Sequence, residues 1–203
     1  MKKFSKKEEL IIVIKLPKWL INSVAVLLIF FVCVFGAVWC TKKVLRLIYP
    51  LKYTSEVEVA SSSYGVEKEL IYAIIKCESG FDEDAKSHAG ACGLMQITPE
   101  TFEWLKKQPK NSPKIVENPD LRDPMTNVMY GTLLVSVLRN KYGEDTKVLS
   151  AYNAGMTAVD RWLGGDKESL SSGDELDYIA YPETKEYVRR VLRAKKIYKK
   201  LYF

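Results

Sequence analysis

The chain has 203 residues, which leaves room for one domain of ordinary size and a short appendage. Its formal net charge of +6 comes from residues 1–50, which hold nine Lys and Arg against two Glu, whereas residues 51–203 hold 22 Lys and Arg against 23 Asp and Glu. A nearly neutral domain does not fit nucleic-acid binding, and a single histidine, His88, excludes a His-based triad and a zinc site with two imidazoles.

The first element in chain order is an apolar segment, Leu20–Val38, which carries no charge over nineteen residues. Trp19 and Trp39 flank it, as aromatic residues do at the two interfaces of a membrane. Residues 19–40 are therefore predicted to form a membrane anchor. The lysines within residues 1–18 make that end a cytoplasmic basic tail, so the rest of the chain is expected outside a single-pass membrane anchor.

Two alternatives to an uncleaved anchor remain open. A cleaved signal peptide has a shorter apolar region that ends in a small-x-small site, but the only small pair here is Gly36-Ala37, and bulky Val38 follows it. A lipoprotein attached through Cys40 needs a small residue where Trp39 stands. Because the sequence fits neither cleavage site well, it favours an uncleaved anchor.

The domain that follows is predicted to be all-α. Residues 41–62 mix polar and apolar side chains and are expected to be a stalk, or else the first helix of a domain assigned to residues 63–203. No segment alternates convincingly at period two, whereas apolar spacing, N-caps and first-turn prolines favour helices. These helices are expected near residues 66–77, 98–104, 124–142, 146–154, 157–163 and 184–202. The basic run 189–200 is interpreted as the solvated side of the last helix.

Glu78 is the main candidate for a catalytic group. It follows the apolar run Ile71–Ile75 at the end of a predicted helix. Both burial and the negative end of a helix disfavour a carboxylate, so its pKa should be raised as a general acid requires. By itself, the same pattern also describes an ordinary solvated acid at a helix end.

Two further motifs follow Glu78 in the sequence. Gly90–Gly93 allows a tight turn, after which Leu94, Met95 and Gln96 offer apolar surface and one amide, a mixture that suits a sugar. Ala151–Gly155 places small residues on both sides of Tyr152 and Asn153. In isolation, the first motif also describes a turn that enters the core, and the second a buried structural tyrosine. Trp104, Met156 and Trp162 are expected in the core.

Glu78–Phe81, Gly93–Gln96 and Ala151–Gly155, in this order, resemble the active-site set of the soluble-lytic-transglycosylase family. The resemblance runs from about Ser63 to Val191 and implies a lysozyme-like helical transglycosylase domain that cleaves peptidoglycan. It implies Glu78 as the catalytic residue. The substrate-binding residues that it implies are Ser87, Gly93, Leu94, Met95, Gln96, Tyr152, Asn153, Glu183 and Tyr187.

The resemblance also implies a reaction with a single carboxylate. Asp82, Glu83 and Asp84 follow Glu78 in a turn and are expected to face solvent, so no second acid is placed across the scissile bond. Glu78 would protonate the leaving glycosidic oxygen and then act as base toward the sugar's 6-hydroxyl, which gives a 1,6-anhydro-N-acetylmuramic acid end. The implied partners are glycan strands and the membrane, with no cofactor and no metal. The sequence identifies no protein partner.

Two other functions remain open at this stage. A goose-type lysozyme-like hydrolase would use the same glutamate with water as the nucleophile. A non-catalytic wall-binding module of an envelope assembly would have no need of Glu78. Cys77 and Cys92 lie near the candidate site and are expected to be two free, buried thiols, with a disulfide as the alternative in an oxidising exterior.

Overall fold

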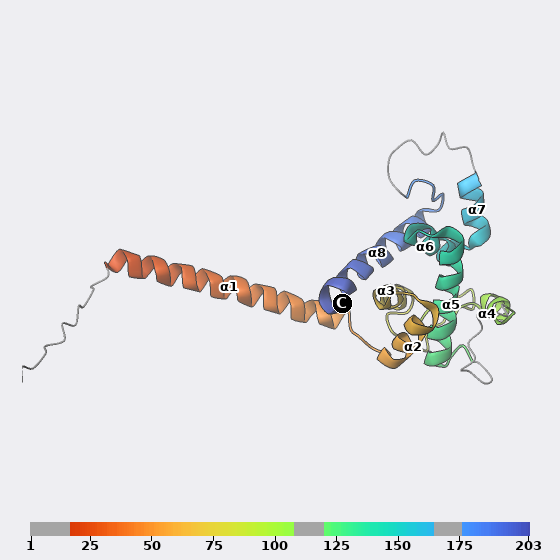
Figure 1. Cartoon of the computed structure of the whole chain (residues 1–203), viewed down its shortest axis with the longest axis horizontal. Helices are drawn as coiled ribbons and strands as arrows, with labels where there is room; N and C mark the ends of the chain where they lie inside the picture. The colour runs from red at the N-terminus through yellow and green to blue at the C-terminus, as the bar shows by residue number, and fades with distance from the viewer. Residues whose placement is uncertain (1–16, 108–119, 165–175) are drawn as a thin grey trace, which may run out of the picture. The chain divides into compact units, whose positions relative to one another are not determined.

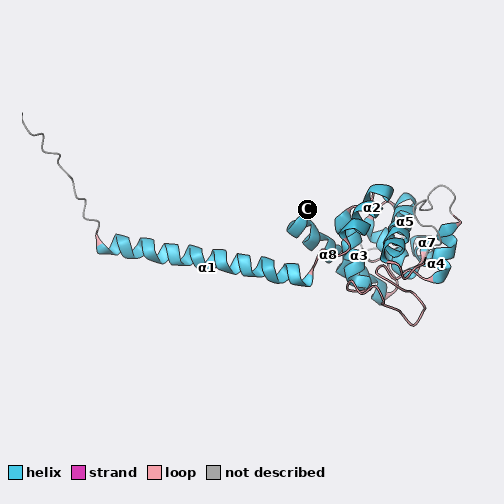
Figure 2. Cartoon of the chain, turned by 90° about the horizontal axis from the view of Figure 1, so that it is seen from below, coloured by secondary structure: helices cyan, strands magenta, loops and turns pink. Residues whose placement is uncertain are grey.

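The computed structural model describes residues 17–107, 120–164 and 176–203. Within these ranges the chain forms eight α-helices and no strand (Figure 2), and only isolated β-bridges join Cys92 to Lys86 and to Ile97. The prediction of an all-α fold is therefore confirmed. The chain divides into two units, Met1–Leu47 and Ile48–Phe203, which are described separately below.

The first unit contains one long helix, α1 (Lys18–Ile48), drawn in red and orange in Figure 1. Its stretch Val26–Ile48 is long and apolar enough to cross a membrane, and none of it is buried within the structure. The helix continues eight residues past the predicted end of the anchor at Cys40, because no helix-breaking residue occurs before Pro50. By length and composition, α1 is a candidate for either a membrane span or a signal sequence.

The second unit begins earlier than the sequence indicated. α2 (Thr54–Tyr64) has Val57 and Ala60 fully buried and packs against α5 (Pro124–Tyr142). It ends at Gly65, whose φ of 65° is readily adopted only by glycine. Residues 54–62 of the segment 41–62 thus belong to the first helix of the domain, the alternative that the sequence left open, because the apolar face of this helix needs a partner to bury against.

The core of this unit forms around four helices, α2, α5, α3 (Lys68–Glu78) and α8 (Pro182–Tyr202). α5 is buried along most of its length, α3 packs against α8, and α2 contacts both α3 and α5 (Figure 1). The pairing of α3 with α8 brings together segments more than one hundred residues apart in sequence.

The shorter helices α4 (Pro99–Lys106), α6 (Asp145–Ala154) and α7 (Met156–Gly164) complete the unit, and α4, like α5, starts at a predicted N-cap. Thr98 caps α4 by accepting a hydrogen bond from the backbone N–H of Thr101, and Asp123 caps α5 by accepting one from that of Thr126. α6 and α7 meet at Gly155. The residues between α3 and α4 form a loop, 79–97, that contains the glycine-rich turn.

Candidate active site

Glu78 is the last residue of α3 and has a half-buried side chain. The five residues Ile71–Ile75 before it are all buried, so the carboxyl group stands at the edge of the core. Burial raises its pKa to about 7, although a hydrogen bond from Tyr187 and the positive charge of Arg190 both act to lower it. The prediction of a raised pKa is therefore confirmed, with burial as its main cause.

Tyr187 is the direct partner of this carboxyl group. It lies on α8, only 2% exposed, and its hydroxyl donates a 2.6 Å hydrogen bond to Oε1 of Glu78. Burial and the nearby charge of Glu78 hold the pKa of Tyr187 well above its usual range, so the hydroxyl stays protonated and remains a donor. The packing of α3 on α8 creates this contact.

Tyr152, on α6, lies near the same carboxyl group. Its hydroxyl donates a 2.6 Å hydrogen bond to the carbonyl oxygen of Met95. Burial and then the charge of Glu78 raise its pKa well above the usual range. The structure thus brings together Glu78, Tyr187, Tyr152 and the backbone of Met95, which come from three helices and one loop.

A cavity of about 350 Å³ that Tyr152 helps to line lies between α4, α5 and the junction of α6 with α7. Its lining includes Trp104 and Met156, which were expected in the core, and both are only partly buried. An aromatic and apolar lining of this kind can hold the ring faces of a sugar.

The glycine-rich loop is held largely by contacts within the protein. Leu94 and Met95 have fully buried side chains, and the carbonyl oxygen of Met95 accepts the hydrogen bond from Tyr152. The amide nitrogen of Gln96 donates to the carbonyl oxygens of Ala85 and Gly93, both at 3.0 Å, and the side chain is partly buried. Substrate binding by these residues stays a prediction.

The loop is fastened by Asn127 of α5, which the sequence analysis missed. Its side chain is 1% exposed. Oδ1 accepts a 2.7 Å hydrogen bond from the backbone N–H of Met95, and Nδ2 donates at 2.9 Å to the carbonyl oxygens of Cys92 and Leu121. The available signal was an asparagine inside an apolar helix, a placement that requires buried hydrogen-bond partners.

Gly93 can lie against the side chain of Asn127 because glycine has no side chain of its own. Its φ of 76° lies in the left-handed region, and a Cβ atom there would overlap the amide of Asn127 and press on the carbonyl oxygen of Leu121. Ser79 adds a second fastening beside Glu78, since its hydroxyl donates to the carbonyl oxygen of Leu94 at 2.9 Å.

Three other predicted site residues lie apart from this group. Ser87 is in the loop and accepts a 3.1 Å hydrogen bond from the backbone N–H of Ala91. Asn153 is exposed and accepts a 2.8 Å hydrogen bond from the hydroxyl of Thr184, which joins α6 to the start of α8. Glu183 is exposed on the first turn of α8. The structure gives none of the three a contact with Glu78 within the described residues.

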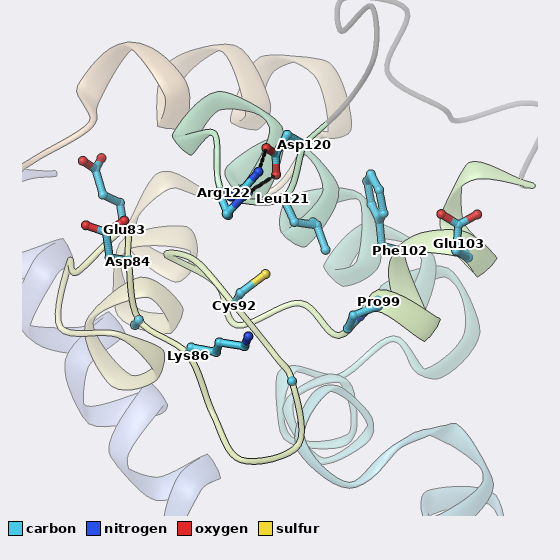
Figure 3. A pocket seen from close by; sticks show the side chains of 12 residues that line it. Glu83, Asp84, Lys86, Cys92, Pro99, Phe102, Glu103, Asp120, Leu121 and Arg122 are labelled. Atoms are coloured by element: carbon cyan, nitrogen blue, oxygen red, sulfur yellow. Dashed lines mark hydrogen bonds and ion pairs between the residues drawn. The ribbon is translucent and has the colours of Figure 1, made fainter.

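The carboxylates that follow Glu78 face solvent, as predicted. Asp82, Glu83 and Asp84 are all exposed. Glu83 accepts a hydrogen bond from the hydroxyl of Tyr53, and Asp82 accepts one from the backbone N–H of Asp84. Glu83 and Asp84 line the rim of a second cavity of about 470 Å³, which Figure 3 shows between the loop, α4 and residues 120–122. Glu78 does not line this larger cavity.

Cys77 and Cys92 are free thiols in the structure, and both are half-buried rather than buried. Burial raises the pKa of the Cys77 thiol to about 11, so this thiol is protonated at neutral pH. Cys92 points into the cavity of Figure 3.

The raised pKa of Glu78 predicts a stability cost that depends on pH. Between pH 4.5 and about 7 the folded state keeps a proton that the unfolded state has released, so this group lowers the stability progressively as pH rises. Glu78→Gln removes the cost, and we expect the variant to be more stable than wild type at pH 8 by roughly 1–3 kcal/mol, and equal at pH 4. Urea unfolding of the detergent-solubilised protein at both pH values measures this.

The matched control is Glu186→Gln, which changes an exposed glutamate of α8. It should unfold like wild type at both pH values. A gain for Glu78→Gln that is as large at pH 4 as at pH 8 would show that ionisation of Glu78 is not the cause.

Comparison with known proteins gives consistent matches over the second unit. Residues 55–173 match the family model described as the transglycosylase SLT domain. The chain is 34% identical over 171 residues to the membrane-bound lytic murein transglycosylase C of Cronobacter sakazakii, a match that covers 73% of this chain and 47% of that protein. It is 32% identical over 145 residues to the soluble lytic murein transglycosylase of Escherichia coli, covering 71% of this chain and 22% of that protein.

Solved structures agree with these matches. The 70-kDa soluble lytic transglycosylase of Escherichia coli superposes with a TM-score of 0.68 at 31% identity, over 77% of this chain and 25% of that one. The lytic transglycosylase Slt of Pseudomonas aeruginosa, solved as an inactive mutant with glutamate replaced by glutamine, gives a TM-score of 0.67 at 28% identity. It too is covered for 25% of its length, and this chain for 77%. The chain spans less than half the length of these relatives.

Proposed function

Because the chain belongs to the transglycosylase SLT domain family, we propose that it is a lytic transglycosylase that cleaves the glycan strands of peptidoglycan. The observation that carries this proposal is the half-buried Glu78, with a pKa of about 7 and a hydrogen bond from Tyr187. A carboxyl group with that pKa exists in both protonation states at neutral pH, so it can first donate a proton and later accept one.

In the proposed reaction Glu78 protonates the glycosidic oxygen that leaves the anomeric carbon of N-acetylmuramic acid. The substrate's own N-acetyl group assists departure, as it does in glycosidases that use substrate assistance. Glu78 then takes the proton of the 6-hydroxyl as that oxygen closes on the anomeric carbon, so the product is a 1,6-anhydro sugar and no water is consumed. Tyr152, whose pKa is raised in part by the charge of Glu78, also lines the cavity of about 350 Å³, which would hold a neighbouring sugar ring.

Mass analysis of the muropeptides released from purified sacculi tests the proposal. We expect 1,6-anhydromuropeptides as the main products. Products heavier by one water would indicate a goose-type lysozyme-like hydrolase. Binding to sacculi with no released fragment would indicate a wall-binding module without enzymatic activity.

We also propose that α1 is an uncleaved, single-pass anchor that places the second unit outside the cell membrane. The uncharged segment and the lysines before it support this orientation. Protease added to intact protoplasts should then digest the domain and leave the N-terminal tail protected. A protected domain, or a mature N-terminus beyond residue 39, would contradict the anchor.

Removal of the Tyr187 hydroxyl should change the pH dependence of cleavage. The hydrogen bond from Tyr187 favours the ionised form of Glu78, so Tyr187→Phe should raise the pKa of Glu78 further. The alkaline limb of the pH–rate profile, where the acid is lost, should therefore move to higher pH. Rates of muropeptide release between pH 5 and 9 measure the shift.

Tyr181→Phe is the control, since Tyr181 is an exposed tyrosine that immediately precedes α8. It should keep the wild-type profile. An alkaline limb that stays in place for Tyr187→Phe would show that this hydroxyl does not set the protonation of the general acid.

A further inference from the structure

The last turns of α8 form a strongly basic surface. After Glu186, α8 contains no acidic residue, and Arg193, Lys196 and Lys200 are exposed at spacings of three and four, which align them on one side of the helix. Lys195 faces the other way and pairs with Asp145. Within the described residues, no ion pair neutralises the three exposed cations.

This end of α8 is fastened to the start of the domain. The hydroxyl of Tyr198 donates to the carbonyl oxygen of Pro50 at 3.2 Å, and that of Tyr202 donates to the carbonyl oxygen of Tyr49 at 2.7 Å. Tyr49 directly follows the last residue of α1. Within the second unit, the residues that directly follow α1 in the chain are therefore held against the end of α8.

Apolar side chains accompany the basic ones at this place. Phe203, the last residue, is 54% exposed, and Leu51 is 37% exposed. Lys52, next to Leu51, adds an exposed cation. Leu51 and Lys52 lie three and four residues after the apolar span ends at Ile48. A mixture of basic and apolar side chains so close to a span is typical of a segment that lies on a membrane surface.

We propose that the C-terminal end of α8, here called the basic end (Arg193, Lys196, Lys200 and Phe203), binds the anionic lipid headgroups of the membrane that α1 crosses. The proposal requires α1 to be an anchor, and it does not depend on the reaction that the site catalyses. The positive charges supply the attraction, and Phe203 inserts at the headgroup level. This second attachment, added to α1, would stop the domain from rotating freely about its anchor.

The test uses the full-length protein in nanodiscs that contain zwitterionic lipid alone or with phosphatidylglycerol. A photo-cross-linking benzoylphenylalanine replaces Phe203, and in a separate protein it replaces Arg161, an exposed residue of α7. We expect lipid adducts at position 203 at least about tenfold above those at position 161 in the anionic nanodiscs, and a loss of adducts as salt screens the charges.

The charge dependence is tested with Arg193, Lys196 and Lys200 changed together to Glu. This variant should lower the adducts at position 203 about tenfold or more, because each basic residue near an anionic surface contributes about a fivefold factor. The matched control reverses Lys106, Lys107 and Arg161, which are exposed on and after α4 and on α7, and should leave the adducts unchanged.

Three results would overturn the proposal: equal adducts at positions 203 and 161, equal adducts in both lipid compositions, or cross-links to an added poly(glycerol phosphate) in place of lipid. The last result would assign the basic end to an anionic wall polymer. Muropeptide release by the same nanodiscs is measured in parallel, so a failure of lipid contact is distinguished from a failure of glycan cleavage.

Discussion

Glu78→Gln is expected to lower the release of muropeptides from sacculi by at least about 10²–10⁴-fold, the usual contribution of general acid–base catalysis. Glutamine keeps the shape of the side chain and can still accept the hydrogen bond from Tyr187, but it cannot donate a proton and recover it. Binding to sacculi should persist, because the cavity beside Tyr152 is unchanged.

The controls for this prediction are Asp82→Asn, Glu83→Gln and Asp84→Asn, made one at a time. All three side chains are exposed in the turn after Glu78, and each variant should keep most of the activity. Near-wild-type release by Glu78→Gln would remove this residue from the mechanism. A large loss in one of the three neighbours would instead indicate a two-carboxylate hydrolase.

Asn127→Ala should cause the largest loss of stability among the variants considered. It removes three hydrogen bonds at once and leaves the N–H of Met95 and the carbonyl oxygen of Leu121 without this partner, whereas the carbonyl oxygen of Cys92 keeps the hydrogen bond from the backbone N–H of Ile97. Each unsatisfied buried group costs about 1–3 kcal/mol, so we expect a loss of about 3 kcal/mol or more in the free energy of unfolding. Urea titration of the detergent-solubilised protein measures it.

Activity should fall together with stability in this variant. Met95 accepts the hydrogen bond of Tyr152, so a loosened loop also displaces that tyrosine from Glu78. Asn140→Ala is the matched control, because Asn140 is an exposed asparagine on the same helix. A change in the free energy of unfolding no larger than that of the control would show that Asn127 does not fasten the loop.

The helices and the acid were predictable from the sequence because they depend on local patterns. Apolar spacing places α3 and α5, and capping residues such as Thr98 and Asp123 mark where helices begin. The raised pKa of Glu78 follows from the apolar run before it, which buries the end of the same helix. Each of these inferences needs only neighbours along the chain.

The roles inside the loop were not predictable in this way. The motif that contains Gly93, Leu94 and Met95 was expected to contact substrate, yet its side chains fill the space between the loop and α5. Their surroundings depend on Asn127, more than thirty residues later, and no pattern along the chain links the two positions. The resemblance to a family implied which residues matter, but the structure indicates what each one touches.

The choice between a stalk and a first domain helix could not be made from the sequence for a related reason. The segment Thr54–Tyr64 has few apolar residues, and on its own it resembles a polar stalk. Val57 and Ala60 become informative only once α5 is present to cover them. For a short helix with a narrow apolar face, the sequence of the helix alone does not show whether it belongs to a core; the helix that packs against it does.

The direct fastening of Tyr49 and Pro50 to α8 also limits where the enzyme can work. A compact unit of this length is about 40 Å across. Under the proposals that α1 is a membrane anchor and that Glu78 is the general acid, the reach of Glu78 from the bilayer would be set mainly by the size of this one unit. The substrate would then be the glycan strands that lie nearest the membrane.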